Sequence, residues 1–283
     1  MKLGIIGFGY WGKIIYKNLK ILGYNDIFIC EINQVDLNQV FNEDRNKIVK
    51  NYKDLNVDRV FVTTQTIEHF DICSFFIQKK IPVFCEKPLT ESLTKSNMLY
   101  ELSEKFKTQL YVDWIFTKNE GVEKIKEIIN KKLFGELLSI NMRRLNKGPV
   151  RLDVDSRIDL SVHDLSVVFF LLGDKTITSK NNLDFKRNHT SKKNDSNITL
   201  IQFSTVNCFI ETSWEYPIKD RTCIFEFEKN KVVWDDLNQI VSFDSTKISY
   251  NSSPLIQSIK SFFDGEINKD LTLKINQFYE NSI

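Results

Sequence analysis

Cysteine, histidine and long apolar runs are scarce in this chain of 283 residues, and each scarcity narrows the class of protein. The five cysteines are odd in number and form no Cys-x-x-Cys pair, which argues against a disulfide framework and for a reducing compartment such as the cytoplasm. Without that pair or a His-Glu-x-x-His motif, we expect no metal. The longest apolar candidate for a membrane span, Val162 to Leu172, is shorter than the ~20 residues required and contains Asp164.

An excess of charge of one sign is also missing. The chain has 39 basic and 37 acidic residues, a formal net charge of +2, and the charges are spread along its length. We therefore expect neither nucleic acid nor a membrane surface as a partner. No signal peptide is expected, because an apolar strand begins directly after Lys2. With 42% hydrophobic and 27% charged residues, the composition is that of a soluble globular protein with one large or two ordinary domains.

What the chain does have is a glycine-rich turn at its start, in the sequence KLGIIGFGYWG. Gly7 permits a tight turn, Gly9 leaves room for a pyrophosphate, and Gly12 lets the following helix pack on its strand. The N-terminus of that helix presents free N–H groups to phosphate. A turn that binds nothing is the alternative. The cofactor-binding candidates of this segment are Gly7, Phe8, Gly9, Tyr10, Trp11 and Gly12.

An acidic residue follows the second expected strand at the distance that dinucleotide binding requires. Glu31 comes directly after the apolar run 26–30 and lies 19 positions beyond Gly12. A carboxylate there accepts hydrogen bonds from the adenosine ribose and repels a 2′-phosphate. No Arg or Lys stands beside it in EINQVD, so NAD is favoured over NADP. A surface carboxylate at a strand end is the alternative.

Strands and helices alternate through the first half of the chain. Apolar runs at 59–64, 81–85 and 109–114 are separated by helical patterns at 67–80 and 92–107. This alternation predicts an α/β fold with a doubly wound parallel sheet, whose ligands sit beyond the carboxyl ends of the strands. The polar segments expected at that edge add five cofactor-binding candidates, namely Thr64, Gln65, His69, Glu86 and Lys87.

The second half of the chain has a different pattern. A helix is expected from about 121, followed by a strand at 137–144 and successive strands at 198–203, 208–214 and 222–228. The strands are short and separated by turn signals, which predicts an α+β domain with an open, mostly antiparallel sheet. We therefore expect two domains, an NAD-binding domain over 1–116 and a substrate-binding and oligomerisation domain over 117–283.

Lys87 is the first candidate for chemistry. It follows a predicted strand in Glu86-Lys87-Pro88 and would project over the crevice where a nicotinamide should lie. A partly shielded lysine there can lose its proton near neutral pH, which suits a general acid or base in the interconversion of an alcohol and a ketone. A solvated lysine at a strand end is the alternative.

Asp159 and His163 are the second candidate. They stand four residues apart at the start of an apolar helix, so both fall on one helix face if Asp159 is already helical. A carboxylate beside an imidazole orients it and raises its pKa, which would make His163 a second acid or base. The alternative is an N-capping aspartate with a packed histidine.

Taken together, these motifs resemble the Gfo/Idh/MocA family of NAD(P)-dependent oxidoreductases. The resemblance rests on GFGYWG with Glu31, TTQTIEH at 63–69, CEKPLT at 85–90, VDWIF at 112–116 and DLSVHD at 159–164. It implies a Rossmann domain joined to an open sheet that carries substrate and often forms an oligomer interface. It also implies a catalytic Lys87, often followed by a cis peptide bond to proline, with Asp159 and His163 in the substrate pocket.

The segment 143–164 resembles the branch of that family that acts on nucleotide sugars in surface-glycan biosynthesis. By this resemblance, Arg144, Asn146 and Arg151 are candidates for holding a diphosphate or a sugar carboxylate, since a guanidinium binds such oxygens in a fork. The chain departs from the family pattern at four positions, which leaves the detailed substrate fit open: Gln65, Asp113, Trp114 and Ile158.

The expected function is hydride transfer between a sugar ring carbon and NAD, with Lys87, Asp159 and His163 as catalytic residues that also contact the sugar. A nucleotide-linked sugar is the expected substrate, and the chain is expected to form a dimer or tetramer. Two alternatives stay open: a dehydrogenase of free sugars or cyclitols, and a retired family member that binds NAD or sugar as a regulatory subunit.

Overall fold

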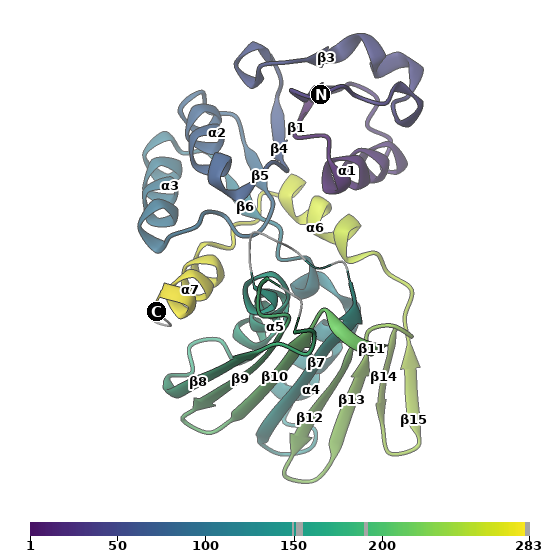
Figure 1. Ribbon diagram of the computed structural model, residues 1–283, viewed down its shortest axis with the longest axis vertical. Coiled ribbons are helices and arrows are strands. Elements are labelled where there is room, and N and C mark those ends of the chain that lie inside the picture. Colours follow the sequence, from purple (N-terminus) through teal and green to yellow (C-terminus); the bar gives the residue numbers. More distant parts are fainter. Residues whose placement is uncertain (149, 151–154, 190–191, 281–283) are drawn as a thin grey trace. The chain divides into compact units, whose positions relative to one another are not determined.

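The chain forms two compact units in the computed structural model, which describes residues 1–148, 150, 155–189 and 192–280 (Figure 1). The first unit combines Met1–Ile115 with the chain from Leu255 onward, and the second comprises Phe116–Pro254. The second unit is therefore inserted into the chain of the first.

A six-stranded parallel sheet forms the centre of the first unit, in the order β3-β2-β1-β4-β5-β6. The strands are β1 (Leu3–Ile6), β2 (Ile27–Cys30), β3 (Ile48–Val49), β4 (Arg59–Val62), β5 (Val83–Cys85) and β6 (Leu110–Val112). The helices between them are α1 (Tyr10–Ile21), α2 (Thr66–Gln78) and α3 (Leu93–Phe106). The predicted doubly wound parallel sheet is confirmed.

The strands of this sheet are buried because helices cover both of its faces, and their sequences are correspondingly apolar throughout. Every residue of β1 is buried, as are all three of β5. Aromatic rings fill much of the core: Phe61, Phe84 and Phe262 lie within 5.1 to 5.6 Å of one another, measured between ring centroids.

The two C-terminal helices, α6 (Pro254–Phe263) and α7 (Lys269–Glu280), pack on this first unit. The sequence-based division had placed the whole of 117–283 in the second domain. Helix α6 buries Leu255, Ile259 and Phe262 in the core beneath the parallel sheet, at the i, i+4, i+7 spacing of one helix face. The hydroxyl of Thr272 on α7 accepts a hydrogen bond of 2.9 Å from the Trp114 indole.

The second unit is built on a nine-stranded sheet with the order β15-β14-β13-β12-β7-β10-β9-β8, in which β11 also pairs with β7. All neighbours are antiparallel except β7 and β10, so the predicted mostly antiparallel sheet is confirmed. The strands are β7 (Leu137–Lys147), β8 (Ile177–Phe185), β9 (Ser196–Phe203), β10 (Asn207–Ser213), β11 (Glu215–Asp220), β12 (Thr222–Phe227), β13 (Lys231–Asp235), β14 (Ile240–Phe243) and β15 (Thr246–Ser249).

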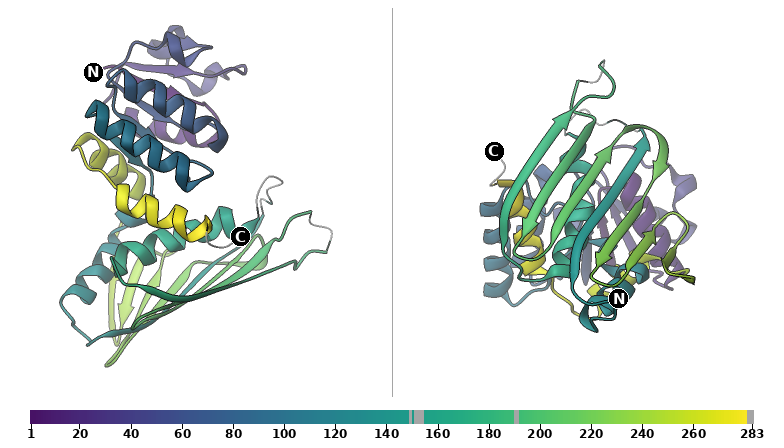
Figure 2. Two further views of the ribbon diagram at one scale, coloured as in Figure 1. Left: turned by 90° about the vertical axis from the view of Figure 1, so that its left-hand side faces the viewer. Right: turned by 90° about the horizontal axis from the view of Figure 1, so that it is seen from below.

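Two helices, α4 (Glu120–Asn130) and α5 (Val162–Leu172), lie on one face of this sheet and leave the other face bare (Figure 2). Alternate strand residues point to the two faces, and the helix-covered side is the buried one. Shorter helical segments complete the described chain: 3₁₀ turns at Leu37–Gln39, Asn42–Lys47, Tyr52–Asp54 and Ile115–Lys118, and a π-helical segment at Arg157–Ser161.

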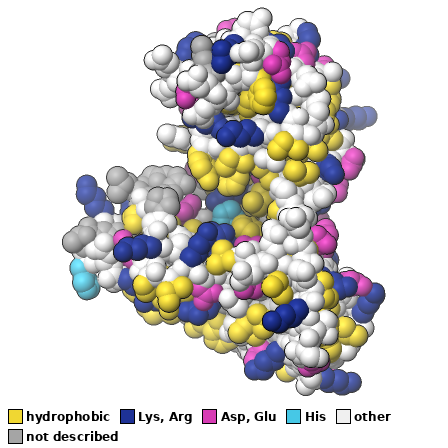
Figure 3. Space-filling model, turned by 90° about the vertical axis from the view of Figure 1, so that its right-hand side faces the viewer, with side chains coloured by type: hydrophobic (Ala, Val, Ile, Leu, Met, Phe, Trp, Pro, Cys, Tyr) yellow, Lys and Arg dark blue, Asp and Glu magenta, His cyan; other side chains and the backbone are white. Residues whose placement is uncertain are grey.

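The surface charges and the cysteines are arranged as the composition of the chain leads one to expect. Basic and acidic side chains are interspersed over the face drawn in Figure 3. All five cysteines are free thiols and are buried. Among the described residues, no helix is long and apolar enough to cross a membrane.

Candidate functional site

The glycine-rich turn between β1 and α1 has the geometry that the motif predicts. Gly7 has φ +88°, in the left-handed region that glycine adopts without strain. A Cβ on Gly12 would lie 2.1 Å from the Gly7 carbonyl oxygen, so only glycine lets α1 approach the turn this closely. A Cβ on Gly9 would meet no atom within 4 Å. Gly9 is therefore not needed for packing and borders open space at the N-terminus of α1.

The turn is braced from β4 by Thr63, which the sequence analysis did not single out. Its hydroxyl donates a 2.6 Å hydrogen bond to the Gly7 carbonyl, and its N–H donates to Ile6 at 2.8 Å. Thr63 and Gly7 are 56 residues apart in the sequence, so the contact between them became visible only with the strand order.

Glu31 is anchored to the same turn. Its Oε2 accepts a 2.7 Å hydrogen bond from the Phe8 N–H, and its Oε1 accepts from the backbone N–H of Asn33 at 3.0 Å. Burial raises the pKa of Glu31, but the N–H groups of Asn33 and Phe8 lower it by more, so the net pKa is below the ordinary value and the group is ionised at neutral pH. The Phe8 ring is 4% exposed within the core, so Phe8 can serve a ligand only through its backbone.

A lysine from elsewhere in the chain lies beside the Glu31 loop. Lys50 donates hydrogen bonds of 3.1 and 2.6 Å to the carbonyls of Ile32 and Asn33. The segment following Glu31 holds no basic residue, but the fold brings Lys50 to it because β3 pairs with β2. A positive charge near this loop weakens the repulsion of a 2′-phosphate by Glu31, so it affects the preference between NAD and NADP.

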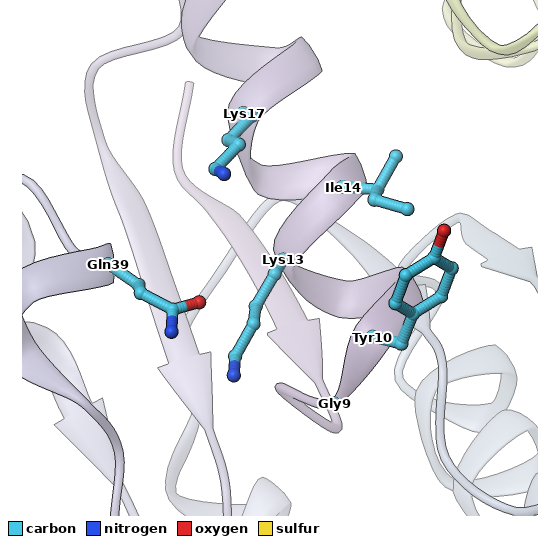
Figure 4. A pocket seen from close by; sticks show the side chains of 6 residues that line it. All are labelled: Gly9, Tyr10, Lys13, Ile14, Lys17 and Gln39. Atoms are coloured by element: carbon cyan, nitrogen blue, oxygen red, sulfur yellow. The ribbon is translucent and has the colours of Figure 1, made fainter.

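A groove of about 410 Å³ runs along α1 from the glycine turn (Figure 4). It is lined by Gly9, Tyr10, Lys13, Ile14, Lys17 and Gln39. The Tyr10 side chain is 77% exposed at its edge. Trp11, also a cofactor-binding candidate, is instead partly buried and packs against the core.

The segment after β4 holds Thr64, Gln65 and His69. Gln65 is exposed at the N-terminus of α2, and the buried hydroxyl of Thr64 has no hydrogen-bond partner among the described residues. His69 is 1% exposed, and its ring nitrogens lie 3.0 Å from the Pro88 carbonyl and 3.1 Å from that of Thr64. Burial lowers the pKa of His69, although both carbonyls oppose this. His69 therefore braces two loops, and its contact with a cofactor stays a prediction.

Lys87 lies at the carboxyl end of β5, half-buried, and its peptide bond to Pro88 is cis, as the resemblance implied. Glu86 beside it is 7% exposed, and burial raises the pKa of Glu86 to about 7, against the opposing charge of Lys87. Asp113, at the end of the neighbouring strand β6, is 1% exposed, and its pKa is also raised by burial and by the charge of Glu86. A cluster of ionisable groups thus occupies the edge where ligands of such sheets bind.

In the second unit, Asp159 lies in the π-helical segment that leads into α5, where His163 stands. Both side chains are half-buried. The Trp214 indole donates a 3.2 Å hydrogen bond to Asp159 Oδ2, and the His163 imidazole packs edge-on against Phe116, with 5.2 Å between ring centroids. Neither aromatic was singled out, since they lie 55 and 47 residues from their partners along the chain. A π-helical turn is often found at a functional site.

Arg144 has a structural position that the sequence did not suggest. It is 2% exposed and binds Asp164 through both Nε and Nη2, at 2.8 to 3.1 Å. Its guanidinium also lies over the Phe116 ring at 4.3 Å. Burial lowers the pKa of Arg144, but Asp164 more than offsets this and raises it overall. Asp164 and Phe116 already occupy the guanidinium, which favours a structural role, and the contact of Arg144 with substrate stays a prediction.

The two remaining substrate candidates differ in status. Asn146 is half-buried on β7, with an amide nitrogen 3.3 Å from the Gly148 carbonyl and an Oδ1 that has no partner among the described residues. Arg151 lies outside the described residues.

The first unit fits a dinucleotide by three observations: the open space at Gly9, the ionised and anchored Glu31, and the unpartnered Thr64 hydroxyl. Backbone N–H groups at a helix N-terminus and a carboxylate at the end of the second strand are the donor set that this ligand requires. No group of three or more potential ligands for a metal ion occurs among the described residues.

The fold and this donor set define a dinucleotide-binding Rossmann unit joined to an α+β unit with an open sheet. Residues 1–114 match the family model described as "Oxidoreductase family, NAD-binding Rossmann fold", that of Gfo/Idh/MocA proteins. The first 114 residues are therefore similar to the NAD-binding domain of this oxidoreductase family.

Named relatives extend the similarity. Myo-inositol 2-dehydrogenase of Thermotoga maritima is 26% identical over 188 residues, which cover 62% of this chain and 56% of that protein. This chain thus spans little more than half the length of the curated relatives it matches.

Among solved structures, UDP-N-acetylglucosamine 3-dehydrogenase GnnA from Acidithiobacillus ferrooxidans superimposes with a TM-score of 0.87 at 16% identity, covering 99% of this chain and 96% of that one. An oxidoreductase from Agrobacterium radiobacter, in complex with NAD⁺, L-tartaric acid and magnesium, gives a TM-score of 0.80 at 15% identity, with coverage of 98% and 93%. At these identities the likeness establishes the fold alone.

Proposed function

We propose that this protein is an NAD-dependent oxidoreductase that transfers hydride between a ring carbon of a sugar and nicotinamide, and that its substrate is a nucleotide-linked sugar used in surface-glycan biosynthesis. The observation that carries the cofactor half is the anchoring of the ionised Glu31 carboxylate to the glycine turn. A carboxylate so placed favours an unmodified ribose over a 2′-phosphate.

NAD, when bound, supplies the hydride acceptor or donor, and the residues of this chain handle binding and proton transfer. The turn from Gly7 to Gly12, Glu31, Thr64 and Gln65 hold the cofactor. Lys87 exchanges the proton of the substrate hydroxyl at its Nζ, from a half-buried position at the carboxyl end of β5. His163 assists, and Asp159, itself held by the Trp214 indole, orients it.

The reaction can be tested with Lys87→Met, which removes the amine and keeps the length of the side chain. We expect turnover to fall below detection while NAD affinity stays within a few-fold of the wild type. Normal turnover of the variant would eliminate the assignment. The matched control is Lys80→Met, an exposed lysine after α2, which should leave both quantities unchanged.

The substrate half of the proposal has two supports, the motif at 143–164 and the likeness in fold to a UDP-N-acetylglucosamine 3-dehydrogenase. The burial of Arg144 removes one expected contact for a diphosphate and leaves Asn146 and Arg151 for that role.

A dehydrogenase of free cyclitols or sugars is the second candidate, favoured by the sequence matches to inositol 2-dehydrogenases. A panel that pairs UDP- and GDP-sugars with the corresponding free sugars and with myo-inositol separates the two. For a nucleotide-sugar enzyme, kcat/KM should drop by orders of magnitude on removal of the nucleotide; equal values would support the second candidate. Failure of all these compounds to reduce bound NAD would instead support a retired, regulatory family member.

We further propose that the chain acts in the cytoplasm and forms a homo-oligomer through the bare face of its nine-stranded sheet. Leu200 and Phe209, 38% and 45% exposed, are directly paired neighbours on β9 and β10. Leu183 and Leu138, on β8 and β7, are 60% and 46% exposed. Exposed apolar patches on a sheet are typical of association surfaces. Light scattering of Phe209→Lys should show a smaller assembly than the wild type.

A further inference from the structure

We propose that Arg221, in the second unit, is an anchor for an anionic group of the substrate, either a phosphate or a carboxylate. The assignment of the anion to the substrate rests on the proposed function, whereas the capacity of Arg221 to bind an anion does not. Arg221 stands between β11 and β12 and belongs to no motif of the sequence analysis. Its place in the sheet, its hydrogen bonds and its electrostatic surroundings carry the proposal.

The register of the nine-stranded sheet places Arg221 opposite Arg144. Cys223 on β12 pairs with Met142 on β7, and the two strands are antiparallel. Arg221 lies two residues before Cys223, and Arg144 is found two residues beyond its pairing partner. Because side chains alternate between the faces of a sheet, both arginines share the face on which Cys223 and Met142 are buried. Two like charges therefore face each other across neighbouring strands, which is unfavourable unless anions compensate them.

The nearby carboxylates do not satisfy Arg221. Asp164 is engaged by Arg144, which donates to both of its oxygens at 2.8 to 3.1 Å. Asp236 follows β13 and accepts a 3.2 Å hydrogen bond from the side-chain amide of Asn119. The Oδ2 of Asp236 lies 3.9 Å from Arg221 Nη1, which is an ion pair but too long for a hydrogen bond.

The guanidinium of Arg221 makes no hydrogen bond with any residue that the structure describes. A guanidinium has five N–H donors and keeps its proton throughout the physiological range of pH. The Nε of Arg221 is buried without a partner, and the two Nη nitrogens are not enclosed as Nε is. The side chain is 26% exposed, against 3% for that of Arg144, so a ligand can reach it from outside.

The surroundings leave the positive charge of Arg221 incompletely compensated. Burial lowers the pKa of Arg221, the charge of Arg144 lowers it further, and the two aspartates oppose this only in part. Burial also lowers the pKa of Arg144, but Asp164 raises it by more. Arg144 is thus neutralised within the protein, whereas Arg221 retains a charge that an incoming anion would balance.

An oxyanion is the ligand that fits these donors. A guanidinium donates two parallel hydrogen bonds to a carboxylate or a phosphate, and such charge-assisted bonds are about twice as strong as neutral ones. A sugar hydroxyl could accept one of these bonds but would leave the charge of Arg221 uncompensated. The diphosphate of a nucleotide sugar and the carboxylate of a uronic acid both carry the required oxygens.

A chain of contacts within the second unit leads from Arg221 to the candidate substrate site. The amide of Asn119 holds Asp236 beside Arg221, and the N–H of Asn119 donates a 3.1 Å hydrogen bond to the Phe116 carbonyl. The Phe116 ring in turn packs against the His163 imidazole, with 5.2 Å between centroids. This continuity assigns the anion to the substrate and not to a separate effector.

Binding of an anion can be measured by calorimetric titration with UDP and with glucuronate, each with and without NADH. Arg221→Met should weaken the binding of at least one of them by about tenfold or more, because the charged fork is removed. Arg221→Lys keeps the charge without the fork and should show a smaller loss. A loss for UDP alone identifies a phosphate as the anion, and a loss for glucuronate alone identifies a carboxylate.

Arg143→Met is the matched control. Arg143 precedes Arg144 on β7, and its charge is already paired with Glu211 and Asp220, at 3.3 and 2.8 Å. This variant removes the same charge and should bind both compounds as the wild type does. The proposal is overturned if the wild type binds neither compound, or if Arg221→Met binds both with wild-type affinity.

Kinetics separate anchoring from a structural role. For an anionic substrate, Arg221→Met should raise KM by about tenfold or more and change kcat much less, whereas kcat/KM for a neutral free sugar should stay the same. An equal loss for charged and neutral substrates would show that Arg221 is structural. Circular dichroism establishes that the variant is folded; if Arg221→Met does not fold, Arg221→Lys decides by the same measurements, and unchanged affinities in it would overturn the proposal.

The failure of this inference and that of the proposed function give different results. If no sugar is turned over but Arg221→Met loses affinity for UDP or glucuronate, the proposed function fails and the anion site stands. If Lys87→Met abolishes the turnover of the wild type while Arg221→Met binds and reacts normally, the anion site fails and the function stands.

Discussion

The two units of the chain differ in the surroundings of their predicted site residues, which border open space in the first unit and include a buried arginine in the second. In the first unit, the residues that the motif singled out border open space or face a ligand edge, as Gly9 and Glu31 do. In the second unit, the charged residue expected at the substrate, Arg144, is enclosed by Asp164 and Phe116. The candidate cofactor site depends on backbone shape, which short motifs encode, whereas the candidate substrate site depends on side chains whose neighbours are distant in the sequence.

Removal of Arg144 tests this difference most directly and should have the largest effect. If it is structural, Arg144→Met leaves Asp164 as an unpaired buried charge, and the free energy of unfolding should fall by about 3–5 kcal/mol. Chemical denaturation measures this. The double variant Arg144→Met with Asp164→Leu should recover most of the loss, because no buried charge remains unpaired. A variant of unchanged stability and lost substrate affinity would restore the substrate role of Arg144.

The glycine turn offers a matched pair of substitutions. Gly12→Ala places a Cβ 2.1 Å from a backbone oxygen and should destabilise the fold by about 1–3 kcal/mol or more. Gly9→Ala meets no atom and should cost about 0.5 kcal/mol or less, yet weaken NAD binding by about tenfold or more. Thermal melts and fluorescence titration with NADH separate the two effects. Equal NADH affinities for Gly9→Ala and wild type would remove Gly9 from the binding surface.

The burial of the Glu86 carboxyl predicts an unusual dependence of stability on pH. Because the folded-state pKa of Glu86 is raised to about 7 from an ordinary 4.5, the folded state binds more protons than the unfolded state between these values. The contribution of Glu86 to stability is therefore full below the unfolded value and is lost as pH rises through about 7. Urea denaturation across this range should show a decline that is shallower in Glu86→Gln, which removes the titrating group. An identical slope in the variant would show that another group causes the decline.

Cofactor preference should give the smallest change. The wild type should bind NADH more tightly than NADPH, and Glu31→Gln should narrow the gap by roughly tenfold, because the repulsion of a 2′-phosphate disappears while the side chain can still accept from the Phe8 N–H. Lys50→Met should widen the gap by removing a positive charge beside the same loop. Tighter binding of NADPH by the wild type would show that Lys50 outweighs Glu31.

How well the site could be predicted depends on how far apart in the sequence the interacting residues lie. Gly7, Gly9 and Gly12 act within six residues, and Glu31 lies at a spacing set by one strand and one helix, so periodicity was sufficient. Thr63, Lys50 and Trp214 act across 17 to 57 residues, and their roles needed the strand order. Both sheets could be predicted from their apolar patterns. Alternation with a period of two indicates a strand buried on one face, and a continuous apolar run indicates a strand buried on both faces.

Two predicted site residues and one domain boundary lie in surroundings that the sequence did not indicate, for a common physical reason. Arg144 and His69 have the residue types that bind ligands, but each is nearly inaccessible and is satisfied by groups of its own unit. The local sequence does not show whether a polar side chain is buried, because a buried ion pair and an exposed one consist of the same residue types. The grouping of α6 and α7 with the first unit was missed for a similar reason, since an amphipathic helix does not specify which core it covers.

Because the second unit is an insertion, bounded by Phe116 and Pro254, the chain has a modular character. Shortening the chain from its C-terminus strips α6 from the parallel sheet and damages the cofactor half first, leaving the nine-stranded sheet intact. Conversely, exchange of residues 116–254 for the corresponding segment of a relative would leave every proposed cofactor-binding residue in place.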